Sequence, residues 1–337
     1  MQNIEHSRIM RIAVLHNAIV ADAPPEDQDT LVQVAAISQS LTRLGHIALP
    51  IACTLDLEEL RATLREARPE LVFNLVESLA GVDSLLYLPV AVLDAMGLPY
   101  TGSRTEALFL SANKLLSKQR MHQAGLPTPA WIETGDTGVP SPIDDDSRMS
   151  WILKGIWEQG SRGMGDDSVL MEVRWAEVLE RLTERIATTG RPAFAEQFIP
   201  GREFNVSVLG GPTGPETLPP AEMCFHNFPE EKPQIVGHQA KWEPDSFEYR
   251  NTVRTFDFSE GDGPLLGELS HLAKDCWQLF GLRGWARVDF RVDHEGHPWI
   301  LEVNANPCLA PDAGFAAALE RGGWSFDEGV ARILADV

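Results

Sequence analysis

The feature that most constrains this chain is a pair of alternating stretches near its C-terminal end, residues 284–292 and 299–304. In both stretches polar and apolar side chains alternate, which is the period of a strand with one buried face. The polar connector between them contains Gly296 and predicts a β-hairpin. Folding the hairpin about Glu295 and Gly296 predicts four opposed pairs: Asp289 with Glu302, Arg287 with Asn304, Val288 with Val303, and Phe290 with Leu301.

Two carboxylates that face each other across strands repel unless a cation lies between them. The oxygen donors of Asp289, Glu302 and Asn304 suit a hard cation, most naturally magnesium that carries phosphate. The alternative is an acidic face in solvent, where opposed carboxylates cost little. The neighbouring Trp285 and Trp299 favour the metal site, because they indicate that the hairpin is not an exposed edge.

Composition narrows the class of protein. A chain of 337 residues is long enough for two or three domains, and its net charge of -21 argues against a nucleic-acid partner. The four cysteines form no CxxC pair, which predicts free thiols and no zinc site. Residues 1–8 lack the apolar core of a signal peptide, and no run is long enough to cross a membrane. We therefore expect a cytoplasmic protein without a membrane partner.

The first third of the chain alternates predicted strands with predicted helices. Strands are expected at 12–15, 47–53 and 71–75 and near 99–100, and helices at 29–44, 57–67 and 87–96. This order predicts a parallel sheet with helices on its faces. Ligands on such sheets gather at the carboxyl ends of the strands, which makes Asn17, Glu77 and Ser78 candidate site residues.

The middle of the chain carries a second candidate site. One helix is expected at 105–123, and the Gly- and Pro-rich run 125–129 marks a domain boundary. A strand at 151–154 ends in Lys154 and is followed by a glycine-rich stretch, 155–165. Such a turn can present backbone N–H groups to phosphate, although it matches neither the P-loop nor the dinucleotide fingerprint. A polar loop is expected at 133–149.

The rest of the chain is predicted as a second α/β region. We expect a helix at 175–187, strands at 194–199 and 204–209, and helices at 265–279 and 326–335, with a Gly- and Ala-rich turn after Pro307. The polar segment 226–263 is expected to be a long loop or lid that carries Lys241 and Trp242.

Several short motifs then occur in one order: 98–102, 113–114, 125–129, Lys154, 160–163, 196–203, 287–289 and 302–307. This ordered set, from about residue 11 to 333, resembles the ATP-grasp superfamily and, within it, the D-alanine–D-alanine ligases and their relatives. The resemblance implies an α/β, three-domain ATP-grasp fold. Its parts would be an N-terminal Rossmann-like parallel-sheet domain at 9–104, a central subdomain with the Gly-rich loop at 105–192, and a C-terminal subdomain with the metal site and lid at 193–337.

The resemblance also implies roles for individual residues. Arg287, Lys241, Ser161 and Glu77 would be catalytic, and ATP would be bound with one or two Mg²⁺, for which Mn²⁺ could substitute. Asp289, Glu302 and Asn304 would be the metal ligands. The nucleotide would be held by Lys114, Lys154 and Lys241 on its phosphates, Gly160, Ser161 and Gly163 in the loop, Glu196, Gln197, Phe198 and Ile199 beside the adenine, and Glu203 on the ribose. Glu203 could instead be an ion-pair partner of Arg202, and each lysine a surface lysine.

The implied reaction is ATP-dependent carboxylate–amine ligation through an acyl phosphate, with small amino-acid-type substrates and a homodimeric enzyme. The chain departs from the family at Glu77, where the ligases have a histidine, and at Trp242, where they have tyrosine or phenylalanine. It has Asp312, and no serine, where the second substrate's carboxylate would bind. We therefore expect an acceptor other than D-alanine alone and recognition of an amine-bearing group. The alternatives are a true D-alanine–D-alanine ligase, a non-catalytic ATP-binding relative and a kinase.

Overall fold

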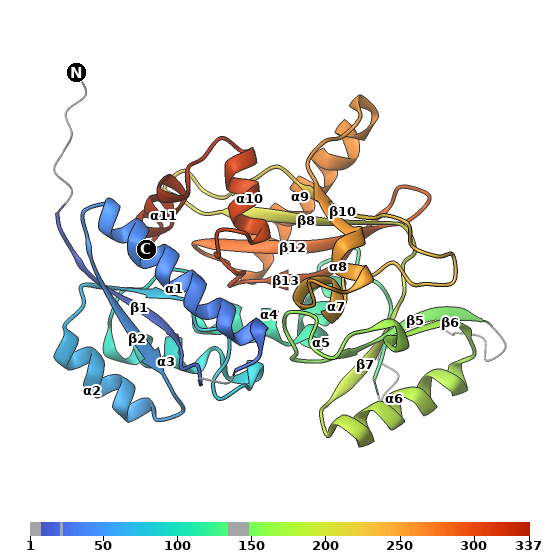
Figure 1. Cartoon of the computed structure of the whole chain (residues 1–337), viewed down its shortest axis with the longest axis horizontal. Helices are drawn as coiled ribbons and strands as arrows, with labels where there is room; N and C mark the ends of the chain where they lie inside the picture. The colour runs from blue at the N-terminus through green and yellow to red at the C-terminus, as the bar shows by residue number, and fades with distance from the viewer. Residues whose placement is uncertain (1–7, 21–22, 134–147) are drawn as a thin grey trace.

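A computed structural model of the chain describes residues 8–20, 23–133 and 148–337. Its strands form three sheets that follow one another along the chain (Figure 1). One is parallel and N-terminal, one is a small central sheet, and one is the larger C-terminal sheet that contains the predicted hairpin. The strand β7 (Ala193–Gln197) lies after the predicted boundary at residue 192 but pairs with the central sheet. The division into three domains stays a prediction.

The N-terminal sheet is the parallel sheet that the strand–helix alternation predicts, in the order β2-β1-β3. Its strands are β1 (Arg11–Asn17), β2 (Ile47–Cys53) and β3 (Leu71–Asn74), and its helices are α1 (Pro25–Arg43), α2 (Leu57–Ala67) and α3 (Leu88–Met96). Helix α1 begins at Pro25, four residues before its predicted start at residue 29. Proline fits the first position of a helix, so the helix can extend to Pro25. The strand expected near Tyr100 is only an isolated bridge to Val72.

The helix expected at 105–123 is two helices, α4 (Thr105–Ala112) and α5 (Lys114–Gln123). Asn113 between them is extended, and its side-chain oxygen accepts the backbone N–H of Leu116 at 2.9 Å. Asparagine is a strong N-cap, so it starts a new helix there. This break places Lys114 at the first position of α5, where its side chain can turn toward the central sheet.

The central sheet has the order β4-β7-β5-β6 and is antiparallel. Its strands are β4 (Trp131–Ile132), β5 (Met149–Gly155), β6 (Val169–Val173) and β7 (Ala193–Gln197). The turn η2 (Asp166–Ser168) precedes β6, and α6 (Trp175–Thr189) covers one face of the sheet (Figure 1). Most of the polar loop expected at 133–149 falls outside the described residues.

The C-terminal sheet contains the predicted hairpin, β12 (Trp285–Val292) and β13 (Pro298–Asn304). Asp289 lies opposite Glu302, and Arg287 lies opposite Asn304, as predicted. The pairing of Phe290 with Leu301 is wrong: a bulge after Asp289 puts Phe290 opposite Ile300. The other strands are β8 (Arg202–Leu209), β9 (Glu216–Thr217), β10 (Ala221–Phe225) and β11 (Thr252–Thr255), with α9 (Gly263–Phe280) packed on β8 and β12.

Two segments expected to be irregular contain regular structure. The predicted loop at 226–263 forms α7 (His238–Trp242), α8 (Phe247–Asn251), β11 and the turn η3 (Glu260–Asp262). The turn expected after Pro307 contains α10 (Gly314–Arg321), and α11 (Phe326–Ala335) follows as predicted. Helix α10 buries Phe315, Ala318 and Leu319 at the spacing of one helical face, so the sequence carried a signal for this helix. The short helices α7 and α8 have no buried residues, so their sequences carry no such signal.

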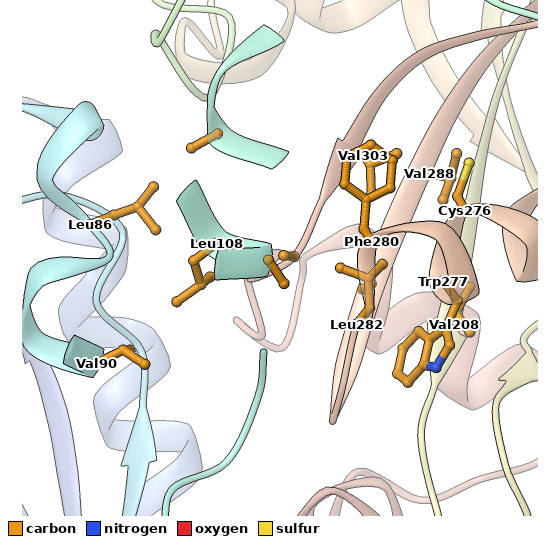
Figure 2. Packing of buried hydrophobic residues seen from close by; sticks show 14 of the residues in the cluster. Leu86, Val90, Leu108, Val208, Cys276, Trp277, Phe280, Leu282, Val288 and Val303 are labelled. Atoms are coloured by element: carbon orange, nitrogen blue, oxygen red, sulfur yellow. The ribbon is translucent and has the colours of Figure 1, made fainter. Parts of the chain in front are cut away.

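The N-terminal and C-terminal sheets are joined by continuous apolar packing. Figure 2 shows Leu86, Val90 and Leu108 on one side of this core, with Val303, Phe280 and Leu282 facing them from the C-terminal part. A second cluster contains Trp285, whose ring stacks on Phe73 of β3 at 5.5 Å between centroids. This packing fixes the loop after β3 against the end of β13.

Candidate active site

The site is built on the polar face of the β12–β13 hairpin. Asp289 is 7% exposed. Its Oδ1 accepts from Nε of Arg287 at 2.7 Å and from Nδ2 of Asn205 at 2.8 Å, and its Oδ2 accepts from Nη2 of Arg287 at 2.8 Å. Asn205 comes from β8, where it lies opposite Asp289. Asn205 was not predicted as a site residue, although the alternation of side chains along β8 places it on the same face of the sheet as Asp289.

Glu302 lies among positive charges. Its carboxylate is 3.3 Å from Nζ of Lys114. Burial alone would raise the pKa of Glu302, but Lys114, Lys241, Lys154 and Arg287 together hold that pKa well below its ordinary range. The pKa of Lys241 is lowered by burial and by Arg287. The structure thus gathers four predicted site cations around one predicted metal ligand.

Lys154 reaches the same region from the end of β5. Its Nζ lies 2.5 Å from Oε1 of Glu196, and the other oxygen of Glu196 is 2.5 Å from Nζ of Lys118. Lys114 donates from Nζ to the carbonyl of Glu158 at 2.7 Å. Lys118 was not predicted as a site residue, although it lies four residues after Lys114 and therefore on the same face of α5.

The segment after Glu196 is held by the protein itself. The N–H of Gln197 donates to the carbonyl of Ala130 at 2.8 Å, and the carbonyl of Ile199 accepts from Nε of Arg291 at 2.9 Å. Arg291 lies over the ring of Phe198. A contact of this segment with adenine stays a prediction.

Glu203 also faces Arg291, whose Nη1 donates to its carboxylate at 3.2 Å. The alternative partner Arg202 instead binds Glu222 and Asp262, so the interpretation of Glu203 as its counter-ion is wrong.

The Gly-rich loop and the lid segment are hydrogen-bonded to each other. Oγ of Ser161 donates to the carbonyl of Val236 at 2.8 Å, and Nε1 of Trp242 donates to the carbonyl of Gly160 at 3.1 Å. Ser161 has a φ of 62°, in the left-handed region that a serine rarely occupies. Gly160 and Gly163 have positive φ as well. The loop is therefore held in one conformation under the lid.

The same loop contacts the N-terminal part of the chain. The backbone N–H of Gln159 donates to Oδ2 of Asp83 at 2.8 Å. The guanidinium of Arg162 pairs with Asp27 and lies 3.5 Å from Asp83. These partners are more than 75 residues away along the chain, so no local pattern in the sequence could have revealed them.

Glu77 lies at a cavity between the N-terminal sheet and the hairpin. Its Oε1 accepts from Nε2 of Gln33 at 2.9 Å. Burial raises the pKa of Glu77 to about 7, with smaller contributions from the negative charges of Asp29 and Asp83. The cavity is lined by Glu77, Gln159, Asn304 and Asn306 and by apolar residues of both parts. The structure thus places Glu77 beside the end of the hairpin that carries Asn304.

The third departure, Asp312, is exposed in the turn before α10. The neighbouring Cys308 donates from Sγ to Oδ2 of Asp29 at 2.9 Å. Asp29 therefore joins the loop after β13 to α1.

The described residues contain neither a cluster of acidic, His or Cys metal ligands nor a membrane-spanning helix. Within residues 8–20, 23–133 and 148–337, no three His, Cys, Asp or Glu side chains come together in a metal-binding group. The predicted metal site therefore rests on two carboxylates and the amide of Asn304. In the same part of the chain, no helix has the length and apolar character needed to span a membrane.

The fold and the site together define an ATP-grasp ligase. The family model described as "D-ala D-ala ligase C-terminus" matches residues 164–335. The D-alanine–D-alanine ligase of Moorella thermoacetica is 30% identical over 324 residues, covering 92% of this chain and 95% of that protein. The ligase of Synechococcus strain JA-2-3B'a(2-13) is 31% identical over 317 residues, covering 92% and 89%.

Solved structures agree on the fold. The D-alanine–D-alanine ligase of Bacillus anthracis, complexed with ATP, superposes with a TM-score of 0.72 at 18% identity over 97% of each chain. D-alanyl-alanine synthetase A of Vibrio cholerae gives 0.71 at 17% identity, also over 97% of each. The chain belongs to the D-alanine–D-alanine ligase family. It is an ATP-dependent ligase that forms a C–N bond, as the sequence predicted.

Proposed function

We propose that the protein uses MgATP to join the carboxylate of one small amino-acid-type substrate to the amine of another, through an acyl phosphate. One observation carries the proposal: Lys114, Lys154, Lys241 and Arg287 act together on the half-buried Glu302, which lies opposite Asp289. Such a concentration of cations beside paired carboxylates suits a nucleoside triphosphate with its metal ion.

The residues present fit magnesium. Asp289, Glu302 and Asn304 would hold it through oxygen atoms alone. Oδ1 of Asp289 already accepts two hydrogen bonds, so Oδ2, which accepts one, would be the ligand atom of that residue. Bound magnesium would draw charge from the terminal phosphate. Lys114, Lys154 and Lys241 would neutralise the phosphates, while Arg287 would stabilise the oxyanion that forms when the amine attacks.

The closed loop and lid support the same chemistry. An acyl phosphate hydrolyses if water reaches it, so the site must be covered during turnover. Hydrogen bonds from Ser161 and Trp242 hold the loop and the lid together over this region. The catalytic role of Ser161 would be to keep this cover closed.

The substrates are proposed from the departures at Glu77, Trp242 and Asp312. Glu77 lies at the cavity beside Asn304, where an anionic side chain would attract an ammonium group. A true D-alanine–D-alanine ligase is the second candidate, favoured by the relatives that carry this name. Membership of an enzyme family weighs against a non-catalytic role. A homodimer and a cytoplasmic location stay predictions.

The decisive experiment is phosphate release from MgATP with D-alanine alone, and then with a panel of paired amino acids and amines. We expect release only with a pair other than D-alanine alone. Strong release with D-alanine alone, with the dipeptide as product, would show that the second candidate is right. A stable phosphorylated product would indicate a kinase.

Glu77 makes this activity pH-dependent in a defined direction. With a pKa of about 7, Glu77 is mostly neutral at pH 6 and mostly charged at pH 8. If the charged form binds a substrate ammonium, KM for that substrate should fall by about tenfold from pH 6 to pH 8. Glu77→Gln should remove this dependence, while Glu180→Gln on the exposed face of α6 should keep it.

The stability of the same variant provides an independent check. Because the folded-state pKa lies above the ordinary value, Glu77 favours the folded state most at low pH and loses this contribution as pH rises through 7. Glu77→Gln should therefore gain stability relative to the wild-type protein between pH 5 and pH 8, measured by urea unfolding. An unchanged difference over this range would contradict the burial of Glu77.

A further inference from the structure

Lys118 is the most buried lysine of the candidate site, and the proposed mechanism does not use it. Its side chain, on α5, is 1% exposed. Nζ lies 2.5 Å from Oε2 of Glu196 and donates to Oγ1 of Thr128 at 2.8 Å and to the carbonyl of Pro129 at 3.2 Å. Two of the three N–H donors of the ammonium are therefore hydrogen-bonded, and the ion pair with Glu196 occupies its remaining side. Lys118 therefore cannot bind a ligand without breaking a buried contact.

Glu196 is shared between Lys118 and Lys154. It is 1% exposed, and its other oxygen lies 2.5 Å from Nζ of Lys154. Although burial would raise its pKa, the two lysines hold the pKa of Glu196 below the ordinary value, so the carboxylate is charged. Two ammonium groups on one carboxylate leave a net charge of +1. Without Lys118, Glu196 would neutralise Lys154.

The location of the two lysines differs. Lys154 is 13% exposed, and its charge acts on Glu302, whereas Lys118 lies behind Glu196 with its ammonium already engaged. The surplus positive charge of the group formed by Lys118, Glu196 and Lys154 is therefore available to a ligand only through Lys154. The geometry separates a lysine that faces the site from one that sets its charge.

We propose that Lys118 is a positioning residue that leaves the charge of Lys154 available to the nucleotide phosphates. By occupying one oxygen of Glu196, it keeps Lys154 from becoming an ordinary neutralised ion pair. This inference rests on the proposed function, because it assumes that Lys154 binds phosphate.

A second set of contacts links Lys118 to the hairpin. Oγ1 of Thr128, which accepts from Lys118, donates to the carbonyl of Ile300 at 2.9 Å. The N–H of Ile300 in turn donates to the carbonyl of Pro127 at 2.8 Å. Ile300 lies two residues before Glu302 on β13. Lys118 thus holds Lys154 and the Glu302 strand in one hydrogen-bonded arrangement.

The test measures nucleotide affinity in the full-length protein by titration calorimetry. Lys118→Met should weaken the binding of ATP and ADP by about ten- to a hundredfold, the loss of one charge-assisted phosphate contact. Adenosine has no phosphate, so its affinity should not change. Lys274→Met on α9 is the control and should behave as wild type. In turnover, KM for ATP should rise with little change in kcat.

The double variant Lys118→Met with Glu196→Gln separates positioning from simple support. In the Glu196→Gln background no carboxylate remains to neutralise Lys154, so adding Lys118→Met should change ATP affinity by less than about threefold. The comparison is between Glu196→Gln and the double variant, so any effect of Glu196 itself on the nucleotide cancels. Lys118→Gln, which still donates to Thr128, serves as a second single variant and should lose the same affinity.

The outcomes distinguish the two proposals. If folded Lys118→Met or Lys118→Gln binds ATP as wild type does, Lys118 only supports the fold and the positioning role is wrong. The same conclusion follows if Lys118→Met costs as much ATP affinity in the Glu196→Gln background as in the wild-type protein, or if adenosine binding falls in parallel with ATP binding. If the wild-type protein itself does not bind ATP, the proposed function fails and this inference fails with it.

Discussion

Glu302→Gln should lower MgATP-dependent phosphate release by about 10²–10³, a loss expected when one charged group that stabilises the reacting phosphate is removed. The half-buried carboxylate of Glu302 opposes Asp289 and is 3.3 Å from Nζ of Lys114. Glutamine keeps the shape but removes the negative charge. It therefore removes both the proposed metal ligand and the counter-charge that gathers the lysines.

The control for this variant comes from the same hairpin. Glu295→Gln lies in the exposed connector between β12 and β13 and should leave activity unchanged. A magnesium titration adds a specific measurement: Glu302→Gln should need more magnesium to reach half of its maximal rate, and Glu295→Gln should not. Wild-type activity in Glu302→Gln would contradict the proposed metal site.

Trp285→Ala should lower the free energy of unfolding by about 3–5 kcal/mol, the usual cost of deleting a large buried aromatic side chain. Trp285 is fully buried and stacks on Phe73 of the N-terminal sheet. Its Nε1 donates to the carbonyl of Pro307 at 2.9 Å, and its ring contacts Gly102. The variant would open a cavity where the hairpin, the N-terminal sheet and the loop after β13 meet.

Two further variants test whether the lost stability comes from the position of Trp285. The free energy of unfolding of each is measured by urea unfolding. Trp285→Phe keeps most of the ring and should cost only about 1–2 kcal/mol, largely the hydrogen bond to Pro307. Trp175→Ala, half-buried on α6, should cost less than Trp285→Ala. If Trp285→Ala and Trp175→Ala were equally stable, the proposed junction around Trp285 would be wrong.

Local pattern predicted most of the regular structure. Alternation in 284–292 and 299–304 predicted the hairpin and the opposition of Asp289 and Glu302, because side chains on a strand repeat with period two. The bulge that shifts Phe290 to Ile300 escaped, since nothing in the local sequence distinguishes a bulged residue from a regular one. The bounds of α2 were also readable at 57–67, and in the structure Asp56 caps its first turn by accepting the N–H of Glu59.

The candidate site was only partly readable in the same way. The sequence identified Lys114, Lys154 and Arg287 as residues of the right chemistry, and the comparisons confirm the family that suggested them. It did not reveal that Lys118 shares Glu196 with Lys154, or that Asp83 caps the Gly-rich loop. The alternative that Glu203 pairs with the adjacent Arg202 was wrong, because its partner is Arg291.

The sequence by itself determined most of the elements, the hairpin register at Asp289 and the class of enzyme, because periodicity, capping and motif order are properties of neighbouring residues. Only the tertiary structure decided which charges meet. Glu77 acquires its raised pKa from burial beside the hairpin, and Lys118 acquires its role from one carboxylate on a distant strand. The strength of an electrostatic interaction depends on distance and burial, and both are set by how the three sheets pack.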